Sequence, residues 1–93
     1  MVIGVCRVEL HLPDRHSLKE KRYVVKSLKD RIRKDFNVSI AEVGDQDVWQ
    51  RAALAAACVG TDRAYVNGVL DQLLRMVERE DGVEIVRSEL EFV

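Results

Sequence analysis

The sequence predicts an α+β domain with the element order strand, helix, strand, strand, helix, strand. Four segments alternate between apolar and polar residues, and two longer segments repeat apolar residues at intervals of three and four. The first pattern is typical of half-buried strands and the second of amphipathic helices. The chain has 93 residues, of which 47% are hydrophobic and 33% charged, and we expect one domain spanning residues 1–93.

Residues 2–12 (VIGVCRVELHL) are expected to form the first strand, because apolar and polar side chains alternate along them. Pro13 should end this strand, since proline has no backbone N–H to offer a sheet. The residues expected to face the core are Val2, Cys6, Val8, Leu10 and Leu12.

A helix should follow Ser17 and end near Asp35. Ser17 and Glu20 have the spacing of a capping box, in which the serine oxygen accepts a hydrogen bond from a free amide and the glutamate reaches back. The apolar residues of one helical face are Leu18, Val25, Leu28 and Ile32.

Residues 36–43 (FNVSIAEV) and 48–60 (VWQRAALAAACVG) alternate again and should pair as a hairpin. The inward side chains would be Phe36, Val38 and Ile40 in the first segment and Ala52, Leu54, Ala56 and Cys58 in the second. If both sets share one face, the numbers of paired residues add up to an even value. This register requires a loop with an odd number of residues, and we predict a loop of about three.

Thr61 or Asp62 should cap a second helix, and Gly82 should close it. The apolar residues at helical spacing are Val66, Val69, Leu70, Leu73 and Val77. Residues 83–93 (VEIVRSELEFV) are expected to form the last strand. Its inward residues would be Val86, Leu90 and Phe92.

This order of elements is that of the ferredoxin-like split βαβ fold. Two right-handed crossovers would give a four-stranded antiparallel sheet with both helices on one face, a two-layer α+β sandwich. The alternative is an open meander with the helices at one end. The ferredoxin-like arrangement is favoured, because each helix follows a strand of matching length.

Three segments, HSLKEKR at 16–22, FNVSIAEVGDQDVWQRA at 36–52 and ACVGTD at 57–62, resemble the bacterial YlxP-like family. The resemblance covers nearly the full chain and implies a small, ferredoxin-like cytoplasmic protein. Genes of this family often lie beside those of translation and ribosome-maturation factors, which points toward RNA or ribosomes as partners. The family has no established activity, so the resemblance implies no catalytic residues.

The charge of the chain is unevenly distributed. Residues 17–34 carry eight basic and two acidic side chains, a net of +6, whereas the other residues carry seven basic and fourteen acidic ones, a net of −7. Five of the cations recur at intervals of three and four and fall within an arc of about 80° of the helix, forming a stripe about 25 Å long. The free amides at the helix start favour an anion there. The candidate nucleic-acid-binding residues are Arg15, His16, Lys19, Arg22, Lys26, Lys29 and Arg33.

The alternative interpretation of this stripe is a solvated helix face whose cations pair with acids such as Asp30. Aromatic residues are only 5% of the chain, which counts against base stacking on a single strand or on the sheet. We therefore expect any RNA to be contacted through its phosphates.

The sheet face away from the helices is predicted to be uncovered. Its apolar residues would be Ile3, Val5, Trp49, Ala53, Ala55, Ala57 and Val59, beside the charged residues Arg7, Arg51, Arg87, Glu89 and Glu91. Exposed apolar patches often mark interfaces, so a homodimer through the sheets is the second hypothesis. The candidate interface residues are Trp49, Arg51, Ala53, Ala55 and Ala57. A monomer that tolerates small side chains there is the alternative.

No catalytic, cofactor or metal site is predicted. His11, Asp14 and His16 lack the spacing of a zinc site. Acids at the predicted hairpin tip should serve solubility, with Glu42 paired to Arg51. Cys6 and Cys58 should lie in the core, and nucleotide-binding and hydrolase patterns are absent from the sequence.

Two functions are therefore expected. The first is a non-enzymatic accessory protein that contacts RNA or the ribosome through the first helix. The second is a dimeric interaction module that acts through the sheet without nucleic acid. We expect a cytoplasmic protein without a membrane span, cofactor or small-molecule substrate.

Overall fold

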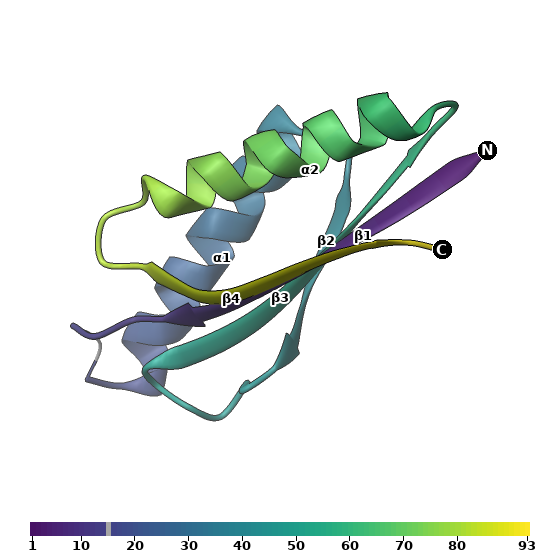
Figure 1. Ribbon diagram of the computed structural model, residues 1–93. Helices are drawn as coiled ribbons and strands as arrows, with labels where there is room; N and C mark the ends of the chain where they lie inside the picture. Colours follow the sequence, from purple (N-terminus) through teal and green to yellow (C-terminus); the bar gives the residue numbers. More distant parts are fainter. Residues whose placement is uncertain (15) are drawn as a thin grey trace.

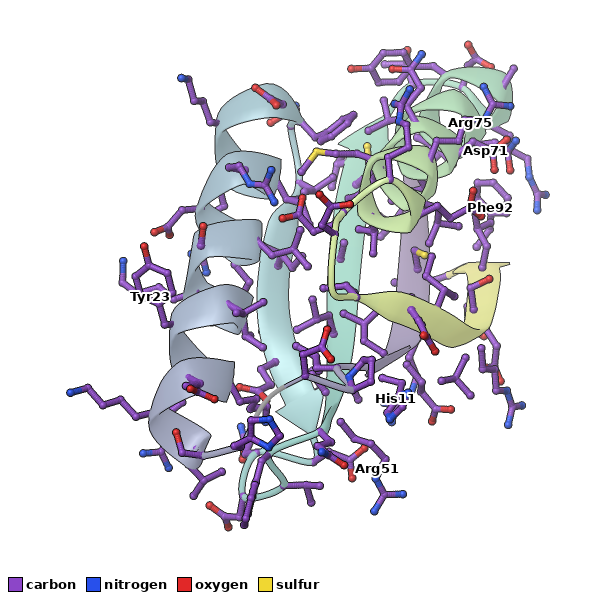
Figure 2. All side chains as sticks on the ribbon, turned by 90° about the vertical axis from the view of Figure 1, so that its left-hand side faces the viewer. His11, Tyr23, Arg51, Asp71, Arg75 and Phe92 are labelled. Carbon is purple, nitrogen blue, oxygen red and sulfur yellow. The ribbon has the colours of Figure 1, made fainter. Side chains whose placement is uncertain are left out.

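The computed structural model describes residues 1–14 and 16–93 and confirms the predicted order of elements. The elements are β1 (Val2–His11), α1 (Leu18–Asp35), β2 (Ser39–Gly44), β3 (Arg51–Gly60), α2 (Arg63–Glu78) and β4 (Glu84–Phe92). The strands form one antiparallel sheet in the order β2-β3-β1-β4, with both helices on one side of it (Figures 1 and 2). This is the ferredoxin-like α+β fold. Among the described residues, no helix is both long and apolar enough to cross a membrane.

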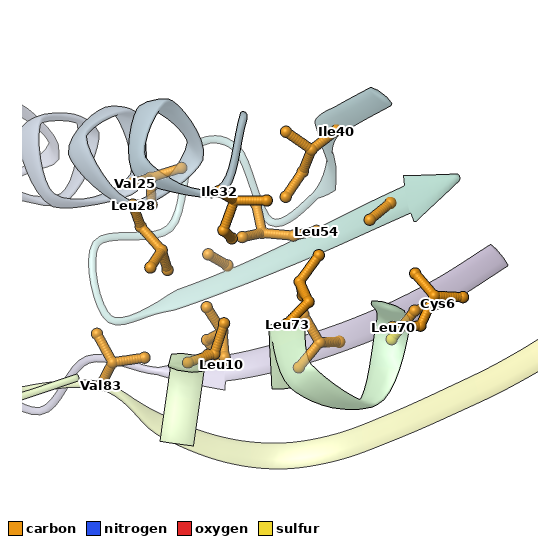
Figure 3. Packing of buried hydrophobic residues seen from close by; sticks show 14 of the residues in the cluster. Cys6, Leu10, Val25, Leu28, Ile32, Ile40, Leu54, Leu70, Leu73 and Val83 are labelled. Atoms are coloured by element: carbon orange, nitrogen blue, oxygen red, sulfur yellow. The ribbon is translucent and has the colours of Figure 1, made fainter. Parts of the chain in front are cut away.

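The core lies between the helices and the sheet (Figure 3), and partly buried residues of β4 pack against it. The even-numbered residues of β1 and β3 face this layer, as their alternation predicts. Leu28 and Ile32 of α1 pack there with Leu70 and Leu73 of α2, and all four side chains are at most 1% exposed. The helices are therefore held to one face of the sheet by apolar burial.

Side chains cap both helices at their N-termini. The Ser17 hydroxyl accepts a hydrogen bond from the Glu20 backbone N–H at 3.2 Å, as the capping box predicts. The Glu20 carboxylate accepts from the His16 N–H at 2.8 Å, one residue before the predicted partner. Asp62 caps α2, accepting from the Ala64 N–H at 2.8 Å. This second helix already ends at Glu78, and Gly82 turns the chain toward β4 with a φ of 77°.

The hairpin of β2 and β3 confirms the even register but not the short loop. Ile40 lies opposite Ala56 and Glu42 opposite Leu54. A bulge then places Gly44 opposite Ala53, and residues 45–50 connect the strands instead of a three-residue loop. Two backbone carbonyl oxygens of this longer loop accept hydrogen bonds from the Lys21 ammonium of α1.

The inward position predicted for Val86 is wrong. The pairing of β1 with β4 shifts by one residue between Glu9 and Leu10, so that Leu10 lies opposite Ile85. A one-residue shift moves a side chain to the other face of the sheet. Val86 is accordingly 67% exposed, whereas Ile85 packs against the core.

Candidate nucleic-acid interface

One lysine of the basic segment, Lys21, is fully buried, with 0% of its surface exposed. Its ammonium donates to the Glu42 carboxylate at 2.6 Å and to the carbonyl oxygens of Asp45 at 2.7 Å and Gln46 at 3.3 Å. These three acceptors match the three donors of an ammonium group. The lysine therefore fastens α1 to β2 and to the following loop, and the predicted pairing of Glu42 with Arg51 is wrong.

The spacing of apolar residues in the sequence already indicates that Lys21 is buried. Position 21 lies three residues after Leu18 and four before Val25, and so falls on the apolar stripe of α1. A charged residue on such a stripe requires a partner in the core, because burying an unpaired charge is costly. Lys21 was counted only in the net charge of residues 17–34, and its position on the apolar stripe was overlooked.

Four of the predicted cations line one groove beside α1. Its volume is about 480 Å³, and Glu42 and Gln46 lie on its β2 side. The helical residues that line it are Arg22, Val25, Lys26, Lys29, Asp30 and Arg33. The structure thus brings together the C-terminal part of the predicted stripe.

Asp30 neutralises part of this groove. Lys26 contacts its carboxylate at 2.8 Å, and Arg33 approaches it at 3.4 Å while also donating to the Ile40 carbonyl at 3.0 Å. The hydrogen bond from Lys26, together with the positive charges of Lys26, Arg33 and Lys29, lowers the pKa of Asp30. Within the described part of the chain, Arg22 and Lys29 have no ion pair, so the groove keeps an excess of positive charge.

The N-terminal part of the predicted stripe is arranged differently. His16 and Lys19 are exposed, but neither lines the groove. The free amide of His16 is taken by the protein's own Glu20 carboxylate, which occupies a position that the prediction assigned to a bound anion. Arg15 lies outside the described residues.

Tyr23 is an exposed aromatic residue that the prediction overlooked. Its side chain is 76% exposed and points away from α1 into solvent (Figure 2). With Lys19, Glu20 and Val24 it lines a small hollow of about 270 Å³. Position 23 lies about 40° beyond Lys19 around the helix, at the edge of the cationic arc. This spacing predicts from the sequence alone that the Tyr23 side chain is exposed beside the cations.

The sheet face opposite the helices carries only part of the predicted interface. Trp49, which is 50% exposed, lies in the loop before β3 rather than in the strand. Ala53 is 1% exposed and offers almost no surface, whereas Ala55 and Ala57 are half-buried and Arg51 is exposed. A shallow hollow of about 560 Å³ lies on this face, lined by Val5, Arg7, Val43, Ala55, Glu89, Leu90 and Glu91.

The described residues contain no group of three histidines, cysteines or acids that could hold a metal ion. Cys6 and Cys58 are buried in the core as predicted. Burial and, to a lesser extent, the Asp71 carboxylate raise the pKa of the Cys6 thiol to about 11, and burial also raises the pKa of Cys58. Both thiols are thereby kept in the unreactive, protonated form at neutral pH.

Comparison with known proteins agrees with the resemblance read from the sequence motifs. Residues 3–90 match the model of a family described as a protein of unknown function (DUF503). The chain is also similar to the uncharacterized protein YlxP of Bacillus subtilis (strain 168), with 38% identity over 90 residues. That alignment covers 95% of this chain and 98% of the relative.

Proposed function

The chain belongs to the DUF503 family, and we propose that it is a non-enzymatic accessory protein that contacts RNA, free or in the ribosome, through α1. The observation that carries this proposal is the groove into which Arg22, Lys26, Lys29 and Arg33 project. Phosphates attract clusters of long cations whatever the base sequence. A cytoplasmic location, where RNA and ribosomes are found, belongs to the same proposal.

The dimensions of the groove suit a stretch of nucleic-acid backbone. From Arg22 to Arg33 the helix rises about 16 Å, at about 1.5 Å per residue, so that several phosphates can be contacted at once. Arginine can bind a phosphate through two parallel hydrogen bonds, whereas lysine acts as a point charge. The groove offers these cations without a set of side chains for reading bases, which favours RNA recognition by backbone and shape.

The test is the double variant Arg22→Gln/Lys26→Gln, measured with a short RNA duplex of mixed sequence and with purified ribosomes. If about four phosphates are neutralised, the wild-type log affinity should fall against log salt with a slope of roughly −3 to −4. The double variant should bind several-fold more weakly, with a shallower slope. Its stability should change by at most about 0.5 kcal/mol, because both side chains are exposed.

The matched control is Arg75→Gln/Arg79→Gln, which removes the same charge near the C-terminal end of α2. This variant should bind RNA nearly as well as the wild type. Equal loss in both double variants would indicate a non-specific effect of net charge. Unchanged binding after the α1 substitutions would mean that the groove is only a solvated surface.

A second candidate function is a homodimer formed through the open sheet face. The observation in its favour is that Val59, which lies opposite Ile3 in the pairing of β1 with β3, is 53% exposed on this face. The same face carries cations and carboxylates, including the Arg87–Glu89 ion pair, so two copies could match opposite charges. Ala55→Glu should convert such a dimer to a monomer, because it buries a charge without a partner. Sedimentation of the wild type as a monomer would exclude this candidate.

A further inference from the structure

The buried pair of Lys21 and Glu42 stands directly behind the basic groove. Glu42 and Gln46 line the groove on the side opposite the helical cations, and Lys21 donates to both residues from the core. The Gln46 side chain donates in turn to the Glu42 carbonyl at 3.3 Å. This wall of the groove is therefore positioned by one ammonium group.

The pair also determines the charge of that wall. The Glu42 side chain is 15% exposed, so its carboxylate is near enough to the groove to repel a bound phosphate. The Lys21 ammonium at 2.6 Å offsets this negative charge from behind. At the effective dielectric constant of a protein surface, which is about 20, a bare carboxylate facing a phosphate would weaken its binding appreciably.

Stability alone does not account for an ion pair at this place. Position 21 lies among Val25, Leu28 and Ile32 on the buried face of α1, where an apolar residue would pack without a desolvation cost. Replacing a buried ion pair with apolar residues of similar volume is often neutral or stabilising. A functional role for the pair, in addition to stabilising the fold, would explain why it is present.

We infer that Lys21 is a positioning residue for phosphate binding, which holds Glu42 and Gln46 as the wall of the groove and cancels the charge of Glu42. This inference rests on the proposed function. It adds that phosphate affinity depends on a side chain that no ligand touches. The class of ligand is a phosphodiester or polyphosphate anion bound between Lys21's partners and the cations of α1.

The experiment compares Lys21→Met with Lys21→Met/Glu42→Leu, using inorganic tripolyphosphate and a short RNA duplex as separate probes. Lys21→Met leaves the Glu42 charge uncompensated and should weaken both probes about three- to tenfold. The double variant has no such charge and should recover most of this loss. Equal binding by the single and double variants would overturn the inference, because a purely structural lysine gives no such rescue.

Glu42→Gln provides a second test that does not depend on Lys21→Met folding. It preserves the shape of the side chain but removes its negative charge, so tripolyphosphate should bind several-fold more tightly than it binds the wild type. Unchanged or weaker binding by this folded variant would also overturn the inference.

The two probes separate this inference from the proposed function. If tripolyphosphate binding follows the expected order of variants and RNA does not bind, the groove is an anion site and only the RNA assignment fails. If the wild type binds neither probe, both fail together. Circular dichroism on each variant identifies any that has lost the fold.

Discussion

Ile85 lies opposite Leu10 in the sheet, while one step along the strand Arg87 lies opposite Glu9. Val86 is the additional residue between these two pairs, and this bulge points its side chain to solvent. Ile85 thereby takes the inward place that simple alternation assigns to Val86.

The bulge predicts that two neighbouring substitutions lower the free energy of unfolding by different amounts. Val86→Ser should change the free energy of unfolding by at most about 0.5 kcal/mol, since the side chain is exposed. Ile85→Ala should cost about 1–2 kcal/mol, less than the ~2–5 kcal/mol of a fully buried isoleucine. Urea denaturation of both variants measures the difference. A larger loss from Val86→Ser than from Ile85→Ala would show that β4 is paired in the uninterrupted register.

Alternation predicted the faces of β1 and β3 correctly, because both lie in the middle of the sheet with one face on the core. It failed at Val86 in the edge strand β4, where the register shifts, and the predicted loop length failed at the bulge before Gly44 in the other edge strand, β2. A bulge depends on how a strand pairs with its neighbour, and local sequence carries little information about that pairing. The edges of this sheet were therefore less predictable than its centre.

The candidate site was predictable in part for a similar reason. Helical spacing identified the cations that line the groove, since the rotation of a helix is regular. It could not show that β2 and the loop after it form the opposite wall, because that contact joins residues distant in sequence. For the same reason, it could not show that the Glu42 carboxylate and the loop carbonyls accept hydrogen bonds from the Lys21 ammonium.

The contact of α1 with the sheet should depend strongly on Leu28, which is 1% exposed. Leu28→Ala removes buried methyl groups and leaves a cavity, so the free energy of unfolding should fall by about 2–5 kcal/mol. Ser27→Ala, at an exposed neighbouring position of the same helix, should change it by at most about 0.5 kcal/mol. Equal denaturation midpoints for the two variants would contradict the observed face of the helix.

The two cysteines should be unreactive in the folded protein. Neither should react appreciably with a disulfide reagent at neutral pH until the chain is unfolded, when both should react rapidly. Rapid labelling of one native thiol would show that its strand opens readily.

The raised pKa of Cys6 also makes stability depend on pH. Because the folded thiol has a pKa of about 11 instead of 9.0, its contribution to stability is complete below pH 9.0 and is lost as the pH approaches 11. Cys6→Ala should therefore flatten the decline in unfolding free energy over this interval relative to the wild type. Parallel curves for the two proteins would indicate that other groups cause the whole decline.

Tyr23 should distinguish single-stranded from duplex RNA. Its exposed ring, one helical turn from Lys19 and Lys26, can stack on an unpaired base while those cations hold the neighbouring phosphates. Stacking on an aromatic side chain contributes about 1–3 kcal/mol per base, so Tyr23→Ala should weaken single-stranded RNA binding by at least about fivefold. A duplex keeps its bases stacked within the helix and should bind this variant nearly as well as the wild type.

Tyr23→Phe is the matched control, because it keeps the ring and removes only the hydroxyl group. It should bind single-stranded RNA like the wild type if stacking is the interaction. A loss with phenylalanine equal to that with alanine would point to a hydrogen bond from the hydroxyl instead. If neither variant alters binding to a single strand, α1 contacts RNA through phosphates alone, and the orientation of the tyrosine toward solvent has no part in recognition.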